Sequence, residues 1–159
     1  NMVVAYVDIN HFKPFNDAFG YSFGDEIILC LSNILRRILD AERDFIGHVG
    51  GDDFIVIFRS ENWRERCEQV FVEFNAAYLD LLPQAQMEYW SNDRNGSRQR
   101  FGALTLAIGC VFPDFTSCTT HHHVSLLLAD AKQSAKLMGG NAIFESRRRH
   151  KPSELQFTN

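Results

Sequence analysis

Residues 45–58 read Phe-Ile-Gly-His-Val-Gly-Gly-Asp-Asp-Phe-Ile-Val-Ile-Phe, two strand-like runs joined by two glycines and two aspartates. Glycine accepts the positive backbone φ that a tight turn requires, so the segment predicts an antiparallel hairpin with strands at Phe45–Val49 and Phe54–Phe58. Carboxylates are unusual at a hairpin tip, which makes Asp52 and Asp53 the first candidates for a functional role. The antiparallel hairpin also argues against a purely parallel, doubly wound sheet.

The segments around the hairpin alternate between strand and helix patterns. Val3–Val7 is a β-branched and aromatic run that predicts a buried strand ending at Asp8. From Asp25, apolar residues recur at helical spacing to about Asp40, with Asp25 and Glu26 expected in the first turn, where the helix dipole favours negative charge. The remaining expected elements are a short helix with a loop in 10–24, a helix over Trp63–Leu81, an exposed loop or hairpin tip in 87–101, a strand over Ala103–Phe112, a helix over Val124–Met138 and a short strand over Ala142–Phe144. This order predicts an α+β or mixed α/β fold, with an antiparallel or mixed sheet and helices on one or both of its faces.

Length and composition restrict the class of protein. The 159 residues, 45% of them apolar, suffice for one domain with a real core, which we assign to residues 1–146, followed by a polar, basic tail at 147–159. The formal net charge of −4 is mild and has the wrong sign for a whole-domain grip on nucleic acid or anionic lipid. No apolar run approaches the roughly 20 residues of a membrane-spanning helix, and the first residues lack the pattern of a secretory signal.

The four cysteines, Cys30, Cys67, Cys110 and Cys118, form neither a CxxC pair nor a dense framework. We expect buried, reduced thiols, which suit a cytoplasmic location and are compatible with a parent protein that is itself membrane-anchored. The histidine run 121–123 follows the last cysteine but lacks spaced partner ligands. It therefore favours a loop or the start of a helix over a zinc site.

Phosphate-binding loops of the usual kinds are absent, since the sequence has no GxxxxGK[ST] and no GxGxxG after a strand. The informative feature is Asp8 at a strand end together with Asp52 and Asp53 on a glycine turn. Phosphoryl chemistry needs carboxylates that hold Mg²⁺ near an open stretch of backbone, and Gly50 and Gly51 supply that openness. On spacing alone, a plain hairpin turn with Asp8 as a helix cap explains the same residues equally well.

Five ordered motifs favour the chemical interpretation. They are Asp8-Ile9-Asn10-His11-Phe12-Lys13 with Asn16-Asp17 and Phe19-Gly20, then Gly24-Asp25-Glu26, then Gly50-Gly51-Asp52-Asp53-Phe54, then Thr105-Leu106-Ala107-Ile108-Gly109, then Ala129-Asp130 with Ala135-Lys136 and Gly139-Gly140-Asn141. In this order and spacing, from about Val3 to Phe144, the chain resembles the GGDEF domains, the diguanylate cyclases of bacterial cyclic di-GMP signalling. The resemblance implies a nucleotidyl-cyclase and polymerase-palm-like fold, a central mixed sheet wrapped by helices, with the glycine hairpin over a triphosphate.

The resemblance also implies a reaction and its machinery. Two GTP molecules, one per subunit of a homodimer, condense into cyclic di-GMP and two pyrophosphates, with two divalent ions, Mg²⁺ or Mn²⁺, in each site. Asp8 and Asp52, assisted by the backbone carbonyl of Ile9, would hold the metal ions, and Asp53 would be the further acid of the turn. For the β and γ phosphates, the resemblance implies contacts with the amides around Phe12 and Lys13 and with the Lys13 ammonium. The turn at Gly50 and Gly51 would also contact the substrate, and Lys136 would neutralise phosphate charge. Asn16 and Asp25 would bind the guanine edge.

Three departures from the family pattern bear on activity and its control. Asp53 replaces the usual glutamate, and Gly140 replaces an arginine that would contact phosphate. Without that arginine, one charge-assisted hydrogen bond to phosphate is lost. Such a loss costs about 1.5 to 3 kcal/mol of transition-state stabilisation, which predicts slower turnover. Ala41 replaces the arginine of an RxxD product-inhibition site, so we expect feedback to be weak or missing unless Arg43 or Arg37 substitutes. The simplest interpretation of the remaining Arg43-Asp44 pair is solvated charge.

These departures leave an alternative to catalysis. In it, the chain is a degenerate domain that binds GTP without turnover and regulates or dimerises the other domains of a longer parent protein. The retained Asp8 and Asp52 favour the enzyme, whereas Asp53 and Gly140 favour the degenerate domain.

Overall fold

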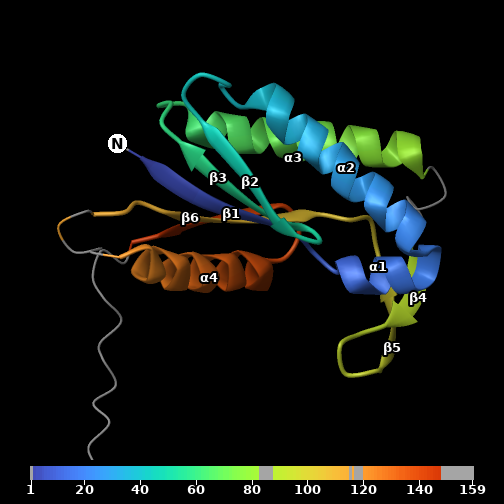
Figure 1. Cartoon of the computed structure of the whole chain (residues 1–159). Helices are drawn as coiled ribbons and strands as arrows, with labels where there is room; N and C mark the ends of the chain where they lie inside the picture. The colour runs from blue at the N-terminus through green and yellow to red at the C-terminus, as the bar shows by residue number, and fades with distance from the viewer. Residues whose placement is uncertain (1, 83–87, 115, 117–119, 148–159) are drawn as a thin grey trace, which may run out of the picture.

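A five-stranded sheet with helices on both faces forms the centre of the fold (Figure 1). The computed structural model describes residues 2–82, 88–114, 116 and 120–147. The strands are β1 (Val3–Ile9), β2 (Phe45–Gly50), β3 (Asp53–Phe58), β4 (Tyr89–Asn92), β5 (Arg98–Phe101), β6 (Leu106–Val111) and β7 (Ala142–Ser146). The helices are α1 (Phe12–Phe19), α2 (Tyr21–Ile38), α3 (Trp63–Leu81) and α4 (His121–Met138).

β1 lies in the middle of the sheet, whose strand order is β2-β3-β1-β6-β7. It pairs antiparallel with β3 and with β6, and β2 and β3 form the expected antiparallel hairpin. β6 and β7 run parallel because α4 connects them as a crossover helix. The sheet is therefore mixed, which confirms the predicted fold class. β4 and β5 form a separate hairpin, so the polar stretch after position 87, itself outside the described residues, contains a hairpin tip.

Alternate residues of β1 point to opposite faces of the sheet, because a strand has a side-chain period of two. The odd-numbered residues from Val3 to Ile9 join the larger hydrophobic core, on the side that α2 and α3 cover (Figure 1). Val4 joins the smaller core under α4 on the other side. Asp8 lies four residues after Val4 and therefore on the same face of the strand, so its carboxylate faces α4 and not the larger core.

The segment 10–24 differs from its prediction, because it contains two helices with a single residue between them. α2 begins at Tyr21, four residues before the expected start at Asp25. Gly20 separates α1 from α2 with a φ of +92°, a conformation that glycine adopts without strain. Asp25 and Glu26 therefore lie beyond the first turn of α2, and the expected charge–dipole interaction at that helix end is wrong.

The other elements match their predictions except at their ends. β1 continues through Asp8 to Ile9, β6 begins at Leu106 instead of Ala103, and β7 extends to Ser146. α4 takes in the histidine run at its beginning. Strand ends depend on pairing partners elsewhere in the chain, which is why local patterns place them only to within a few residues.

The described part of the chain ends at Arg147, so the rest of the proposed tail at 147–159 lies outside it. β7 ends at Ser146, the last residue of the proposed domain. Within the described residues, no helix has the length and apolar character needed to cross a membrane.

At Gly109 of β6, α4 lies directly against the sheet with no side chain between them. A Cβ atom at this position would lie 2.3 Å from the backbone nitrogen of Lys132 and 2.4 Å from the carbonyl carbon of Ala131. Because both contacts are to helix backbone, a side chain at position 109 would push α4 away. The missing side chain of Gly109 therefore sets the height of Lys132 above the sheet.

Replacing Gly109 with alanine should destabilise the fold by about 1 to 3 kcal/mol, the usual range for overpacking a core. Gly102→Ala is the matched control, because an added Cβ there would meet nothing within 4 Å. Urea unfolding followed by circular dichroism measures both changes. Equal unfolding midpoints for the two variants would show that α4 does not rest on Gly109.

Candidate functional site

Asp8 is a buried carboxylate whose two oxygens both contact lysines of α4. The residue is 5% exposed. The Lys136 ammonium contacts Oδ1, and Lys132 Nζ lies 3.4 Å from Oδ2. Buried charges are stable in proteins only when they are paired, so the two lysines explain how Asp8 remains in this position.

The tip of the β2–β3 hairpin brings Asp52 to the same place. The Ile9 N–H donates a hydrogen bond of 3.2 Å to Asp52 Oδ2. Burial raises the pKa of Asp52 and the negative charges of Asp8 and Asp53 raise it further, while the hydrogen bond from Ile9 opposes them. Acidic groups from two distant segments therefore meet beside the glycine turn.

Asp53 shares one of the lysines with Asp8. Its Oδ1 accepts a hydrogen bond of 3.3 Å from Lys132 Nζ, so this ammonium bridges the two carboxylates. The same nitrogen lies 4.2 Å from the centre of the Tyr6 ring, a cation–π contact. Partial burial lowers the pKa of Lys132, but the charges of Asp53 and Asp8 outweigh it and raise the pKa above its ordinary value. Lys132 is thus a charged member of the site.

The glycine turn is braced by His48 and open on its outer side. Gly51 has a φ of +55°, which favours glycine. His48 Nε2 lies 2.7 Å from the Gly51 carbonyl oxygen, and the His48 ring stacks on Phe54 with ring centres 4.6 Å apart. A Cβ atom at Gly50 or Gly51 would meet nothing within 4 Å, so the backbone of the turn is accessible to a ligand.

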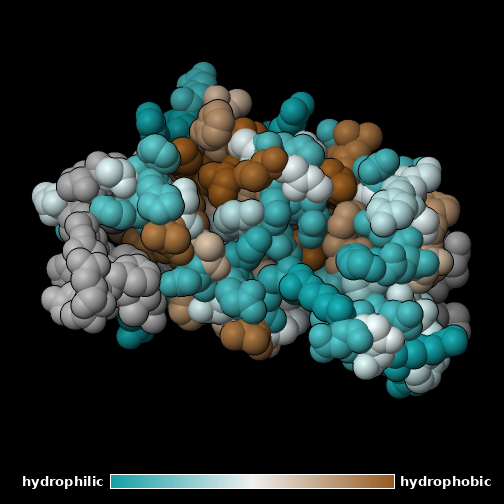
Figure 2. All heavy atoms as spheres, turned by 60° about the horizontal axis from the view of Figure 1, so that its bottom comes forward, coloured by the Kyte–Doolittle hydropathy of each residue, from teal (hydrophilic) through white to brown (hydrophobic). Residues whose placement is uncertain are grey.

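A cleft of about 470 Å³ opens at these carboxylates, between the β1–α1 junction, the hairpin tip, the β4–β5 hairpin and α4. This volume lies within the roughly 300 to 1,000 Å³ of small-molecule sites. Seven of the residues implied by the family resemblance line it, namely Asp8, Ile9, Phe12, Lys13, Asp52, Asp53 and Lys136. Figure 2 turns the α4 side toward the viewer and shows hydrophilic side chains over much of this face, with hydrophobic ones in separate patches.

α1 begins at the cleft with backbone amides that no side chain caps. His11 precedes the helix in a left-handed conformation with a φ of 55°. Unpaired N–H groups at a helix start attract anions. Two cations lie near this helix start, since the charges of Lys136 and Arg94, after burial, lower the pKa of His11. The Lys13 ammonium, in contrast, is engaged by Asp17 at 2.5 Å in this structure.

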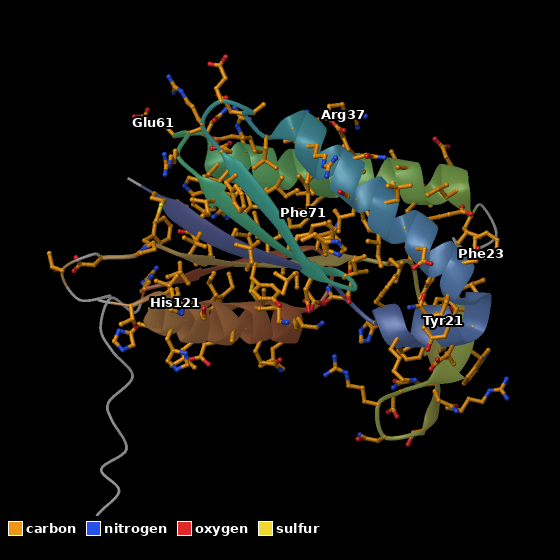
Figure 3. All side chains as sticks on the ribbon, viewed as in Figure 1. Tyr21, Phe23, Arg37, Glu61, Phe71 and His121 are labelled. Carbon is orange, nitrogen blue, oxygen red and sulfur yellow. The ribbon has the colours of Figure 1, made fainter. Side chains whose placement is uncertain are left out.

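Four of the implied residues are not among those that line the cleft: Gly50 and Gly51 of the turn, and Asn16 and Asp25, implied for guanine recognition. Asn16 packs against Gly24 of α2, where a Cβ atom would lie 1.9 Å from Asn16 Oδ1. That oxygen is buried and has no hydrogen-bond partner among the described residues, which is rare for a buried acceptor. Asp25 is exposed on α2, as is Tyr21 at the beginning of the same helix (Figure 3).

Sequence patterns assigned no role to Lys132, or to Asn10 of the first motif. Both are polar residues of the site, and they are buried or half-buried. Lys132 lies four residues before Lys136, and this spacing places both on one helix face, a signal present in the sequence. Asn10 Nδ2 donates hydrogen bonds of 3.0 Å to the Thr105 hydroxyl and to the Gly140 carbonyl. The backbone at Gly140 thus anchors the end of β1, at the position where the family usually carries an arginine.

Asp44, the acidic residue of the segment 41–44, has a structural role. Its side chain is fully buried and accepts hydrogen bonds from the backbone N–H and the hydroxyl of Ser60. The expectation of solvated charge is therefore wrong for Asp44, because folding uses its carboxylate to tie the end of β3 to the segment before β2. Arg37, a candidate substitute for the missing arginine, pairs with Glu73 of α3.

The histidine run lies apart from the carboxylates. His121 stands at the beginning of α4 (Figure 3), and Lys136 is in its last turn. Among the described residues, no group of three or more His, Cys, Asp or Glu side chains could hold a metal ion by itself. Cys118 lies outside the described residues, and the three described cysteines are free thiols, two of them buried.

A larger cleft of about 830 Å³ lies beside β7 and α4. Arg64 and Glu145 line it and form an ion pair with each other. The three carboxylates line the smaller cleft. The smaller cleft is therefore the candidate site, because of the acidic groups that line it and not because of its volume.

Curated relatives match short parts of the chain. The signaling protein YkoW of Bacillus subtilis is 37% identical over 62 residues, which are 39% of this chain and 8% of that protein. The probable diguanylate cyclase DgcC of Escherichia coli (strain K12) is 47% identical over 51 residues, which are 32% of this chain and 14% of that protein. The chain thus spans well under a fifth of the length of these relatives.

Solved structures match nearly the whole chain. The diguanylate cyclase SiaD of Pseudomonas aeruginosa, in complex with its activator SiaC, has a TM-score of 0.65 and 18% identity, with 91% of this chain and 50% of that chain covered. The GGDEF domain of DgcB from Caulobacter crescentus, in complex with c-di-GMP, has a TM-score of 0.60 and 23% identity, with 91% and 77% covered. At such identities the likeness concerns the fold, and it confirms the expected cyclase-type sheet wrapped by helices.

The model of the family described as "Diguanylate cyclase, GGDEF domain" matches residues 1–85. This range contains the hairpin, α1 to α3 and the three acidic residues of the site. Lys132 and Lys136 lie beyond it. Since the match extends over more than half of the sequence, the chain belongs to the GGDEF domain family.

Proposed function

We propose that this domain condenses two GTP molecules into cyclic di-GMP and two pyrophosphates, as a homodimer that uses Mg²⁺ or Mn²⁺. The observation that carries the proposal is the meeting of Asp8 and Asp52 at an open glycine turn, beside the uncapped start of α1. Membership of the GGDEF family and a relative named as a probable diguanylate cyclase support the same chemistry. The free thiols and the GTP substrate favour action in the cytoplasm.

The donor set fits a divalent cation that arrives with a nucleotide. Mg²⁺ in phosphoryl-transfer sites is held by one or two carboxylates and by the phosphates of the substrate, without a cage made of protein alone. Asp8, Asp52 and the Ile9 carbonyl offer such a set. The raised pKa of Asp52 reflects burial beside two other carboxylates, a repulsion that a cation would relieve. When bound, the metal lowers the pKa of the attacking 3′-hydroxyl and neutralises phosphate charge.

The residues of this chain would position the triphosphate. The amides around Phe12 and Lys13, at the start of α1, and the open backbone at Gly50 and Gly51 suit phosphate oxygens. Lys136 supplies a positive charge from α4, where it contacts Asp8. Most of the rate enhancement would then come from positioning and electrostatics, with no covalent nucleophile.

Asn16 and Asp25 would bind the guanine. The partnerless Asn16 Oδ1 is a buried acceptor that a purine N–H would satisfy. The exposed Asp25 carboxylate, on the neighbouring α2, offers acceptors for the other donors of that base edge. The described part of the chain offers one pair of guanine-binding residues, Asn16 and Asp25, whereas cyclic di-GMP contains two guanine nucleotides. Two domains must therefore face each other during the reaction.

A second candidate is a domain that binds GTP without turnover and regulates or dimerises a longer protein. The pairing of both Asp8 oxygens with Lys132 and Lys136 favours it, because the two ammonium groups compete with a metal ion for this carboxylate. Gly140 also removes a cation from the phosphate site. The two candidates differ in whether a product forms.

The purified 159-residue chain, incubated at high concentration with GTP and Mg²⁺ or Mn²⁺, should form cyclic di-GMP that liquid chromatography detects. Asp52→Ala should lower the rate by two orders of magnitude or more, about the loss expected for a metal-binding or electrostatic group. Asp80→Ala is the control, because Asp80 is exposed on α3 and outside the cleft. GTP binding without product in the unmodified chain would instead support the regulatory candidate.

Replacing Asp52 with asparagine should leave the domain at least as stable as wild type at neutral pH. The raised pKa means that the folded state binds a proton more tightly than the unfolded state does. The contribution of Asp52 to stability is therefore present at low pH and is lost as pH rises through the folded pKa. Asparagine removes the charge and keeps an acceptor for the Ile9 N–H, so the melting temperature of the variant relative to wild type should rise with pH, by up to about 3 °C.

Asp8→Asn is the matched comparison in that experiment. It leaves Lys132 and Lys136 without their shared carboxylate, so this variant should melt well below wild type across the same pH range. Thermal unfolding at mildly acidic and mildly alkaline pH measures all three proteins. A larger loss for Asp52→Asn than for Asp8→Asn at alkaline pH would contradict the charge balance derived for the site.

A further inference from the structure

One ammonium group stands between two of the three acidic residues. Lys132 Nζ lies 3.4 Å from Asp8 Oδ2 and 3.3 Å from Asp53 Oδ1. A cation held by these two carboxylates would have to lie in the space that this nitrogen fills. Lys136 contacts the opposite oxygen of Asp8. The Asp53 edge of the site is therefore neutralised by a side chain of this protein.

Lys132 is held in place by its backbone and by its side chain. The backbone at position 132 rests on Gly109 of β6 with no space between them, which fixes the height of the helix. The side chain is 22% exposed, and its ammonium lies over the Tyr6 ring of β1. Tyr6 and Asp8 are two residues apart on the same face of β1, so the strand supplies both contacts at the spacing of its side chains.

A divalent ion and this ammonium cannot both lie between Asp8 and Asp53. Two positive charges at contact distance repel strongly in a partly buried site, where the effective dielectric constant is well below that of water. Asp52 is in a different position. It accepts a hydrogen bond from the Ile9 N–H, and no lysine contact to its carboxylate is present among the described residues. A metal ion can therefore reach the Asp52 side of the site without displacing Lys132.

We propose that the Lys132 ammonium is a built-in cation that takes the place of one divalent ion between Asp8 and Asp53. The domain then takes up a single divalent ion, on the Asp52 side, and Asp53 is the partner of Lys132 and not a metal ligand. This inference rests on the proposed function for its metal and nucleotide. It differs from that function in the number of ions bound and in the role of Asp53.

Electron paramagnetic resonance of free Mn²⁺ tests the proposal by counting bound ions. With the whole chain and a saturating non-hydrolysable GTP analogue, the wild type should bind one Mn²⁺ per domain. Lys132→Met should bind two, because methionine keeps the length of the side chain and removes its charge. Lys132→Arg retains the charge and should bind one.

Two Mn²⁺ per wild-type domain, or one per Lys132→Met domain, would overturn the proposal. If the GTP analogue does not bind, the proposed function fails, and titration with Mn²⁺ alone decides the role of Lys132. An affinity for Mn²⁺ about tenfold or more higher in Lys132→Met than in wild type supports the proposal, and equal affinities overturn it. Thermal unfolding checks that the variant is folded, and Lys132→Gln takes its place in both titrations if it is not.

Discussion

Asp8 of β1 and Asp53 of the hairpin lie beside Asp52 in this domain because two lysines of α4 pair with Asp8 and one of them also with Asp53. Grouped negative charges destabilise a folded chain: burial raises the pKa of Asp52, and the charges of Asp8 and Asp53 raise it further. Lys132 and Lys136 supply the compensating positive charge. They reach the carboxylates because Gly109 lets α4 lie directly on the sheet. Perturbed titratable groups gather at functional sites, where stability is given up for chemistry.

The fold separates the parts that give stability from the parts that carry the site. The larger core lies between the sheet and the pair α2 and α3, and it contains the bulkiest buried side chains, among them Phe15, Phe54, Phe74 and Tyr78. The smaller core under α4 holds the other face of β1 and β6. The carboxylates lie at the rim of this smaller core, next to the hairpin turn and the start of α1. The sheet thus presents acidic groups to one cleft, together with the start of α1 and next to the open turn.

Much of the fold could be predicted from local sequence, because its signals are local. Glycines with alternating apolar runs predict the hairpin, and the order of strand and helix patterns predicts a mixed sheet. The start of α2 could not be predicted in this way, since the break at Gly20 is one residue long and leaves the helical pattern nearly continuous. The roles of Lys132 and Asp44 depend on contacts with distant segments, namely β1 and the hairpin for Lys132 and the end of β3 for Asp44. Spacing placed Lys132 beside Lys136, but only the register of α4 on β6 places it between two carboxylates.

The most direct test of this account is a crystal structure of the domain with Mn²⁺ and a non-hydrolysable GTP analogue, with the metal located by its anomalous scattering. The account predicts an anomalous peak within coordination distance of Asp8 and Asp52 and beside the Ile9 carbonyl. The triphosphate should lie between the glycine turn and the start of α1, and the purine should lie at Asn16. A nucleotide bound elsewhere, or a nucleotide in the cleft with no anomalous peak at Asp52, would contradict it.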